Sequence, residues 1–235
     1  MIRFVDVSGS THHGGGMTLP APPSLRERNR LAARDAILDA AERLLERGEA
    51  AEFSMRELAV EAGKGFVTPF NHFGSKGAIM QALSGRVIDR MEARFREEAP
   101  GGDALERTLA MGRIAAACLL ERPAVYKAVV GSLGTVGPMP SEVRPRSRAL
   151  WELALGDLEG ISADLHGRAR AILADQVAFA FRGCVSFWIA GDVADDRLCA
   201  TVETVTATAL LGFAAPSRRE RVLTAMAFHD DPGQA

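Results

Sequence analysis

The sequence has few lysines and no excess of charge of either sign. Lysine supplies only Lys64, Lys76 and Lys127 among 28 basic residues, and the others are arginine, the side chain better suited to bidentate contacts with phosphate and guanine. The 30 acidic residues bring the formal net charge to −2. A chain that holds nucleic acid by its overall charge is therefore excluded, and any such partner must be met by a local basic patch.

Cysteine is also scarce. Cys118, Cys184 and Cys199 are an odd number, show no CxxC spacing and stand among apolar neighbours, so we interpret them as buried reduced thiols; a redox sensor or a metal site is the alternative. His12 and His13 lie in a glycine run without a third ligand and are interpreted as part of a tail. We predict neither a metal nor a cofactor.

Long hydrophobic runs are missing as well. The uncharged runs 129–141 and 204–217 are shorter than the roughly 20 residues of a spanning helix. No charged segment followed by an apolar one opens the chain, so no secretory signal is predicted. Together with 47% hydrophobic and 25% charged residues, which is typical of soluble globular proteins, these features predict a cytoplasmic location and no membrane partner.

The first 24 residues differ in composition from the remainder. They are rich in glycine, serine and proline, a composition typical of disorder. We therefore predict a disordered N-terminal extension at 1–24. Translation could also start at Met17, which would leave the first sixteen residues upstream.

From Leu31 onward the apolar residues recur at helical spacing. Gly48 is expected to end the first helix, and Ser54 with Glu57 forms a capping-box pattern at the start of a second. Ser75, Asp103, Ser141 and Asp195 are further candidate caps. The predicted helices are the first up to Gly48, then 54–63, an element at 64–73, one from Ser75 to Pro100, and helices near 103–121, 123–133, 141–160, 164–190, 194–214 and 216–229. The predicted fold class is all-α.

The region 25–80 carries the functional signal. Its second helix is short and is followed by Ala62-Gly63 and a third short helix. Two short helices joined by a tight turn containing glycine make a helix-turn-helix, whose second helix can enter a DNA major groove. The spacing alone is a weak signal, because many helical bundles contain it.

Two stretches strengthen that signal. Ser54-Met-Arg-Glu-Leu-Ala-Val-Glu-Ala-Gly63 and Thr68-Pro-Phe-Asn-His-Phe-Gly-Ser-Lys76 resemble the pattern T-x-x-x-I-A-x-x-A-G-V-S-x-G-T-L-Y-x-H-F-x-S-K of the TetR family of bacterial transcription regulators. The first helix, Arg34 to Leu45, is also similar to that of the family. The resemblance implies a three-helix DNA-binding domain at 25–74 and a larger helical effector-binding and dimerisation domain at 75–235.

The resemblance and the chemistry of the side chains together indicate the residues that contact DNA. Arginine and lysine suit phosphates, a helix start suits an anion, and hydroxyl and amide groups suit base edges. The predicted DNA-binding residues are Arg28, Arg30, Ser54, Arg56, Gly65, Phe66, Val67, Thr68, Phe70, Asn71, His72 and Lys76. The arginines could instead be a solvated helix start, and Phe73 is expected in the core.

The sequence departs from the family pattern at 64–69. Lys64 and Gly65 replace an aliphatic residue and a capping serine, and Phe66 and Val67 stand where DNA contacts are expected. Pro69 leaves two possibilities for the third helix: a late start with Thr68 as the cap, or a start near Gly65 with one lost amide bond. With either start, the surface of the third helix that would face the DNA bases is predicted to be apolar.

The larger domain is predicted to bind an effector and to form a homodimer. A largely apolar pocket suggests a hydrophobic small molecule. Two half-sites on DNA require two DNA-binding domains, and a homodimer supplies them. Every residue named next for the pocket or for the interface could instead be an ordinary core residue. The predicted pocket residues are Met111, Ile114, Cys118, Tyr126, Val130, Trp151, Leu155 and Phe179. The predicted interface residues are Val177, Cys184, Phe187, Trp188, Val202, Val205 and Ala209.

The predicted function is therefore a ligand-responsive regulator, expected to be a repressor, that binds a palindromic operator as a dimer. The alternative is a protein of this family with an altered head that acts without ligand or through protein contacts. No GxSxG, HExxH, P-loop or GxGxxG motif is present, and Cys118 with His166 lacks a third group to orient it. We therefore predict that the chain is not an enzyme.

Overall fold

The structure of the chain, a computed structural model, describes residues 24–47, 52–133 and 142–226. Within these ranges the regular elements are helices, apart from one isolated β-bridge between Ile161 and Ala214. The predicted all-α fold is confirmed. Several sequence predictions concern residues outside these ranges, namely the extension before Ser24 with His12, His13 and Met17, and the helix-ending positions Gly48 and Ser141.

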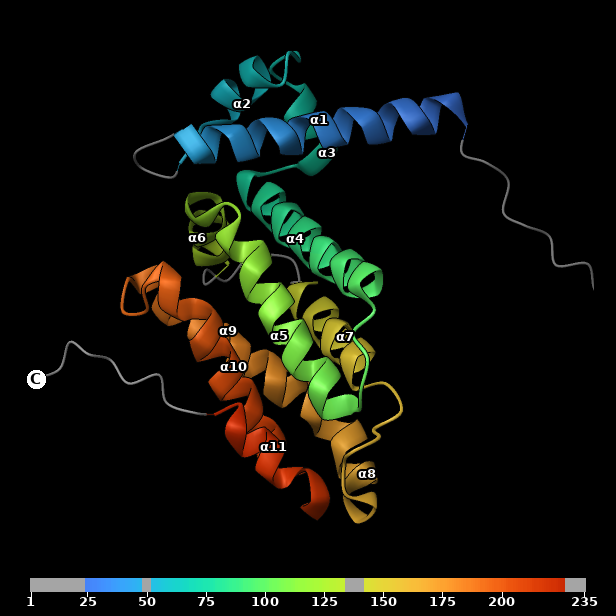
Figure 1. The fold of residues 1–235 in the computed structure, drawn as a ribbon. Coiled ribbons are helices and arrows are strands. Elements are labelled where there is room, and N and C mark those ends of the chain that lie inside the picture. Colours follow the sequence, from blue (N-terminus) through green and yellow to red (C-terminus); the bar gives the residue numbers. More distant parts are fainter. Residues whose placement is uncertain (1–23, 48–51, 134–141, 227–235) are drawn as a thin grey trace, which may run out of the picture.

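Three helices form the N-terminal head: α1 (Leu25–Arg47), α2 (Met55–Glu61) and α3 (Thr68–Phe73). Figure 1 shows α1 crossing the head, with α2 and α3 beside it. The buried face of α1 begins at Ile37. Leu31, which the periodicity assigned to the apolar stripe, is exposed instead, because the first turns of α1 extend beyond the helices that would cover them. Ser24 caps this helix by accepting a hydrogen bond from the Glu27 amide.

Helix α4 (Lys76–Glu98) connects the head to the body. The hydroxyl of Ser75 accepts from the Ala78 amide and so caps the helix as predicted. Its predicted apolar face is buried throughout: Ile79, Leu83, Val87, Met91 and Phe95. One continuous helix therefore runs from the head along the body.

The body packs the remaining helices around α5. They are α5 (Ala104–Leu120), α6 (Pro123–Ser132), α7 (Val143–Leu155), α8 (His166–Arg168), α9 (Ala174–Ala190), α10 (Asp195–Leu211) and α11 (Arg219–Thr224), with short 3-10 turns at Ala163–Leu165 and Pro216–Arg218 and a π-helical segment at Ala169–Leu173. Helix α10 packs against both α5 and α9, and α7 packs against α5 and α9. One continuous apolar core results.

The structure differs from the sequence prediction at the end of α7 and at the cap of α10. The helix predicted at 141–160 ends at Leu155, because Gly156 takes a positive φ of 52° and turns the chain. Asp195 is not a cap. It is the first residue of α10, and its carboxylate accepts hydrogen bonds from Lys127 and from the indole of Trp188 instead. Asp103 does cap α5, and Glu106 completes a capping box there.

One helical stretch in the described ranges, Ala163–Ala190, is long and apolar enough to cross a membrane by length and composition alone. The core helix of a soluble protein passes the same test. Here Leu173, Val177, Cys184 and Trp188 pack into the body's core, so the stretch is weak evidence and does not indicate a membrane protein.

Candidate nucleic-acid interface

The turn between α2 and α3 has the geometry of a helix C-cap. Gly63 adopts a positive φ of 61°. Its amide donates to the Val60 carbonyl at 3.0 Å, and the Lys64 amide donates to the Ala59 carbonyl at 2.9 Å. These two bonds make a Schellman motif, which satisfies carbonyls that the helix end would leave free. The chain can therefore reverse within a few residues and present α3 beside α2.

The start of α2 is held by the predicted capping box. The Ser54 hydroxyl accepts from the Glu57 amide, and the Glu57 carboxylate accepts from the Ser54 amide at 2.7 Å. These hydrogen bonds to Ser54 lower the pKa of Glu57, so a negative charge stays at this helix start. A phosphate placed directly on Ser54 would meet that charge, and the neighbouring cation Arg56 is the better partner.

Helix α3 uses the late start, one residue earlier than the sequence suggested. Val67 is the cap residue without a side-chain hydrogen bond, and Thr68 and Pro69 are the first helical residues. Pro69 lies in the first turn, where no intrahelical donor is needed. Gly65, Phe66 and Val67 therefore belong to the turn before α3 rather than to the helix, and the Gly65 carbonyl accepts from the Thr68 amide.

The exposed edge of the turn and α3 is apolar, as predicted. Phe66 is 56% exposed and Val67 is 59% exposed. The rings of Phe66 and Phe70 meet edge to face at 5.6 Å, which orients Phe66 without burying it. Asn71 is exposed nearby, and Thr68 and His72 are partly buried. The turn and α3 thus carry the predicted residues Gly65, Phe66, Val67, Thr68, Phe70, Asn71 and His72.

The opposite side of α3 is anchored to α1. The guanidinium of Arg34 stacks on the Phe73 ring at 4.1 Å and donates to the His72 carbonyl at 3.1 Å. Phe73 packs against the core, partly buried. Arg34 is thereby committed to positioning α3, and the outer residues of α3 remain free to face a partner.

Cations border this apolar edge. Arg56 and Lys64 are exposed and, with Ala59, Val60 and Phe66, line a surface hollow of about 360 Å³. The Lys76 ammonium lies 5.1 Å from the Phe53 ring centre and 3.9 Å from a Glu52 oxygen. These are weak contacts that a phosphate could replace.

Arg28 and Arg30 lie apart from this cluster, on the first turns of α1. Arg28 is exposed, and Arg30 pairs with Glu27 at 2.9 Å. Figure 1 shows this end of α1 extending past α3. The two arginines therefore lie beyond the surface that α3 exposes.

The body contains an apolar cavity of about 70 Å³ that touches α4, α5, α6, α7 and α9. Its lining differs from the predicted pocket. It consists of Ser84, Val87, Ile88, Met91, Leu119, Val130, Leu133, Val143, Ser147, Leu150, Phe181, Arg182 and Val185. Of the predicted pocket residues, only Val130 is among them.

The other predicted pocket residues lie elsewhere. Met111, Ile114, Cys118 and Trp151 are buried in the core without lining the cavity. Tyr126 is also buried, beneath the Arg90 guanidinium, and burial raises its pKa to about 12.

Two more of the predicted pocket residues lie away from this cavity. Leu155 lines a separate surface hollow beside Ala169, and Phe179 is 51% exposed on the outer face of α9. Helical periodicity groups residues by face, but it does not say which neighbouring helix each face meets.

The residues predicted for the dimer interface divide between the core and the surface of the chain. Val177, Cys184, Trp188 and Val202 are buried within the chain's own core, and a partner cannot reach them. Val205 and Ala209 are partly buried. Phe187 is 59% exposed, together with Phe179 and Ile172 on the same helical stretch. The outer face of α9, and not its inner stripe, is an accessible apolar surface of the body.

The three cysteine side chains pack against apolar neighbours. Burial raises the pKa of Cys118, Cys184 and Cys199, which disfavours the reactive thiolate. Cys199 is partly exposed, whereas the other two are buried. His166 contacts the Ile161 carbonyl at 3.2 Å. Among the described residues, no group of three or more His, Cys, Asp or Glu side chains could hold a metal ion.

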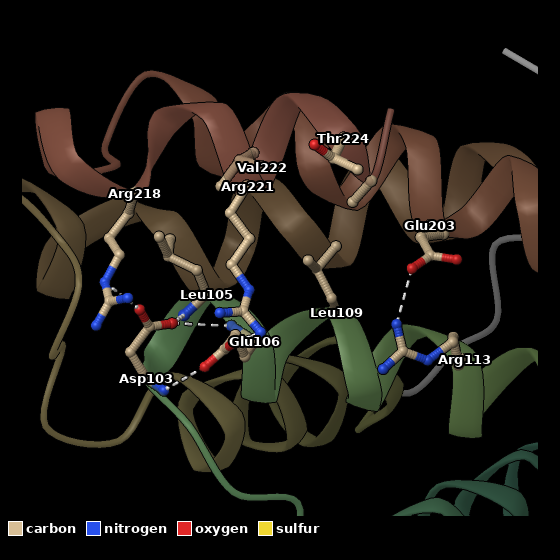
Figure 2. Close-up of a pocket in the computed structure, with 11 residues that line it drawn as sticks. Asp103, Leu105, Glu106, Leu109, Arg113, Glu203, Arg218, Arg221, Val222 and Thr224 are labelled. Carbon is tan, nitrogen blue, oxygen red and sulfur yellow. Dashed lines mark hydrogen bonds and ion pairs between the residues drawn. The ribbon is translucent and has the colours of Figure 1, made fainter. Parts of the chain in front are cut away.

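A larger hollow of about 450 Å³ lies between α5, α10 and α11, on the opposite end of the body from the head. Figure 2 shows its arginines paired with carboxylates: Arg113 with Glu203 at 2.7 Å and Arg218 with Asp103 at 3.1 Å. Arg221 also pairs with Glu106, at 2.5 Å. The charges of this hollow are balanced internally.

Sequence reasoning missed a polar cluster that joins head and body. Glu42 of α1 is buried, and its carboxylate pairs with Arg122 and lies 3.7 Å from Arg86 and 3.6 Å from Arg90. The available signal was a glutamate between Ala41 and Leu45 on the apolar stripe of α1. Its arginine partners come from α4 and from the start of α6, which no local pattern reveals.

The family of bacterial regulatory proteins, tetR family, matches residues 37–83, which cover most of the head and the start of α4. No curated protein matches the chain. One similar solved structure is a TetR transcriptional regulator from Rhodococcus sp. RHA1, with a TM-score of 0.64, 22% identity, and coverage of 77% of this chain and 97% of that one.

A second similar structure is described as a gamma-butyrolactone receptor (ArpA like protein). Its TM-score is 0.50 and its identity is 17%, over 84% of this chain and 96% of that one. At these identities the structures show a shared fold. The match to the tetR family model lies in the head and the start of α4, and the solved structures extend the likeness in fold to the body.

Proposed function

We propose that the chain is a cytoplasmic, ligand-responsive transcriptional repressor that binds a palindromic operator as a homodimer. The observation that carries the proposal is the exposed edge formed by the turn and α3, bordered by Arg56, Lys64 and Lys76 and held from behind by Arg34. A short helix presented beside a second one, with cations at its rim, suits insertion into a major groove.

The proposed DNA contacts are of two kinds: contacts to phosphates, which position the protein on the duplex, and contacts to bases, which depend on sequence. Arg56, Lys64 and Lys76 are placed to neutralise backbone phosphates, which supports affinity without base preference. Arg28 and Arg30 on the projecting end of α1 would add contacts further along the duplex. Asn71 offers hydrogen bonds to a base edge, and Phe66 offers an apolar contact to a thymine methyl group.

The homodimer would form through the outer face of α9. Ile172, Phe179 and Phe187 are exposed apolar side chains on one helical stretch, and Gly183 lies between the last two. A second copy packed on this face would bury them and pair the two heads. Two heads can read half-sites about one DNA turn apart, which one head cannot.

Ligand response would operate through the apolar cavity. Ser84, Val87, Ile88 and Met91 of α4 line it, and the same helix begins at Lys76 beside the recognition segment. A ligand that prefers one position of α4 would shift the population of head arrangements. The fold of the gamma-butyrolactone receptor supports this use of the body for a small molecule.

A second candidate function rests on the apolar character of the head. Val60 is 77% exposed and, together with Phe66, borders the hollow between α2 and the turn. A head of this kind could contact another protein rather than read a base sequence. In that case the regulator would act without ligand or through protein contacts.

The experiment is selection of binding sites from a random duplex library by the purified protein at about 100 mM salt, where phosphate contacts still hold but do not dominate. The proposal expects a palindrome whose half-sites are centred about 10 base pairs, or a multiple, apart. Enrichment of no sequence by the folded dimer, before and after refolding from denaturant to remove bound ligand, would contradict it and favour the second candidate.

A further inference from the structure

Arg182 stands in the apolar cavity of the body without a counter-charge. It lies on α9, next to Phe181, among aliphatic side chains from α4, α6 and α7. No acidic side chain lines this cavity in the described part of the chain, and Arg182 forms no ion pair there. Its polar neighbours in the lining are Ser84 and Ser147.

The hydrogen bonding of Arg182 is incomplete. One guanidinium nitrogen, Nη2, donates to the Val130 carbonyl at 3.1 Å. Val130 lies near the C-terminal end of α6, where the helix dipole offers a partial negative charge. An arginine carries five N–H donors, so a single carbonyl leaves most of them without a protein acceptor. Burial without a charged partner also lowers the pKa of Arg182.

The hollow between α5, α10 and α11 differs from this cavity in its charges. There, Arg113, Arg218 and Arg221 each face a carboxylate of the same chain. Arg182 is partly buried, and a cation held against an apolar wall is stabilised by a charged partner. In the cavity, the chain supplies the cation and the apolar wall but no anion, and a ligand can supply the missing group.

We propose that the cavity binds a small carboxylic acid, whose carboxylate pairs with Arg182 and whose apolar body packs against Val87, Met91 and Leu150. This deepens the proposed function, on which it rests, because it assigns the chemical class of the effector. The planar guanidinium matches a carboxylate in a bidentate manner. An apolar wall favours this singly charged group over the more strongly hydrated inorganic phosphate.

The size of the cavity limits the ligand. At about 70 Å³ it has room for roughly five water molecules, taking 10–15 Å³ for each. This volume fits a short aliphatic acid. A ring needs more space, since a cavity of about 150 Å³ holds benzene.

The test titrates the full-length protein with propanoate, butanoate, hexanoate and benzoate, and with the matching amides, by calorimetry. The wild type is expected to bind at least one of the aliphatic acids about tenfold or more tightly than its amide, as a charge-assisted hydrogen bond implies. Arg182→Gln is expected to lose this preference while keeping the amide affinity, which shows that the cavity is still folded. Arg182→Lys should retain part of it.

The matched control is Arg113→Gln, because Arg113 is half exposed and lies on another face of the body. It should leave every affinity unchanged. Equal binding of acid and amide by the wild type, a preference that survives Arg182→Gln, or no binding of any acid would overturn the proposal. Selection of the operator is a separate experiment. A neutral ligand that releases the protein from DNA would therefore contradict the proposed carboxylic-acid effector without contradicting the proposed DNA-binding function.

Discussion

Arg122, at the start of α6, donates a hydrogen bond to the carboxylate of Glu46 on α1 with an Nη2–Oε2 distance of 2.6 Å. The same guanidinium pairs with the buried Glu42. These two carboxylates belong to the head and the arginine belongs to the body. These ion pairs therefore help to fix the orientation of the head relative to the body.

Removal of the Glu42 charge should destabilise the protein. Glu42→Gln leaves Arg86, Arg90 and Arg122 facing a neutral group, and we expect a loss of about 2 kcal/mol in the free energy of unfolding. This is below the roughly 3–5 kcal/mol of a fully buried pair, because the three arginines are partly exposed. Urea denaturation measures it. Glu46→Gln is the control, with a smaller loss because this carboxylate is exposed and screened by solvent; equal losses would contradict the prediction.

The cations at the rim of the head should act as phosphate contacts. Arg56→Gln and Lys64→Gln are each expected to weaken DNA binding similarly for all sequences and to reduce the slope of log K against log salt by about 1. Fluorescence anisotropy at several salt concentrations measures both. Arg219→Gln on α11, at the far end of the body, should change neither. An unchanged slope in both head variants would remove these residues from the interface.

Phe66 should read thymine methyl groups. Phe66→Ala is expected to change the free energy of unfolding by less than about 0.5 kcal/mol, since the side chain is 56% exposed. The sharper measurement replaces thymine by uracil, which lacks the methyl group, at single positions of the selected operator. One contacted methyl is worth about 0.8 kcal/mol, so the wild type should lose roughly fourfold in affinity and Phe66→Ala should lose nothing. The same loss in both proteins would exclude the contact.

Phe187 should hold the dimer together. Phe187→Glu places a charge on the outer face of α9, where burial against a second copy would desolvate it. Sedimentation velocity is expected to show a monomer and the selected operator to bind more weakly. Val60→Glu on the head serves as the control, because it also replaces an exposed apolar side chain. A Phe187→Glu protein that remains dimeric would place the interface elsewhere.

Asp195 should contribute stability that depends on pH. Hydrogen bonds from Lys127 and Trp188 lower its pKa below the usual 3.8. A carboxylate with a depressed pKa stabilises the fold above its unfolded value and loses that contribution as pH falls through the folded value. The difference in Tm between the wild type and Asp195→Asn should therefore be constant above about pH 5 and shrink below pH 4. A difference that grows on acidification would reverse the assignment.

Local signals in the sequence were read correctly because their partners lie within a few residues. Ser54 with Glu57, Ser75 and Asp103 cap their helices as their spacing indicates. Asp195 failed by the same method, because its carboxylate turns to a lysine on α6 and an indole on α9. A capping pattern shows that a side chain can accept a hydrogen bond from a nearby amide. A partner that is distant in sequence can still bind that side chain instead.

The amino-acid sequence by itself determined that the chain is helical and that residues 54–76 form a helix-turn-helix, because helical period, capping and the glycine of the turn are local properties. Only the tertiary structure decided that Phe187 faces outward while Trp188 beside it is buried, and that Arg182 has no carboxylate near it in the described part of the chain. Those outcomes depend on how each helix is rotated against neighbours that are remote in sequence, and periodicity carries no record of that rotation.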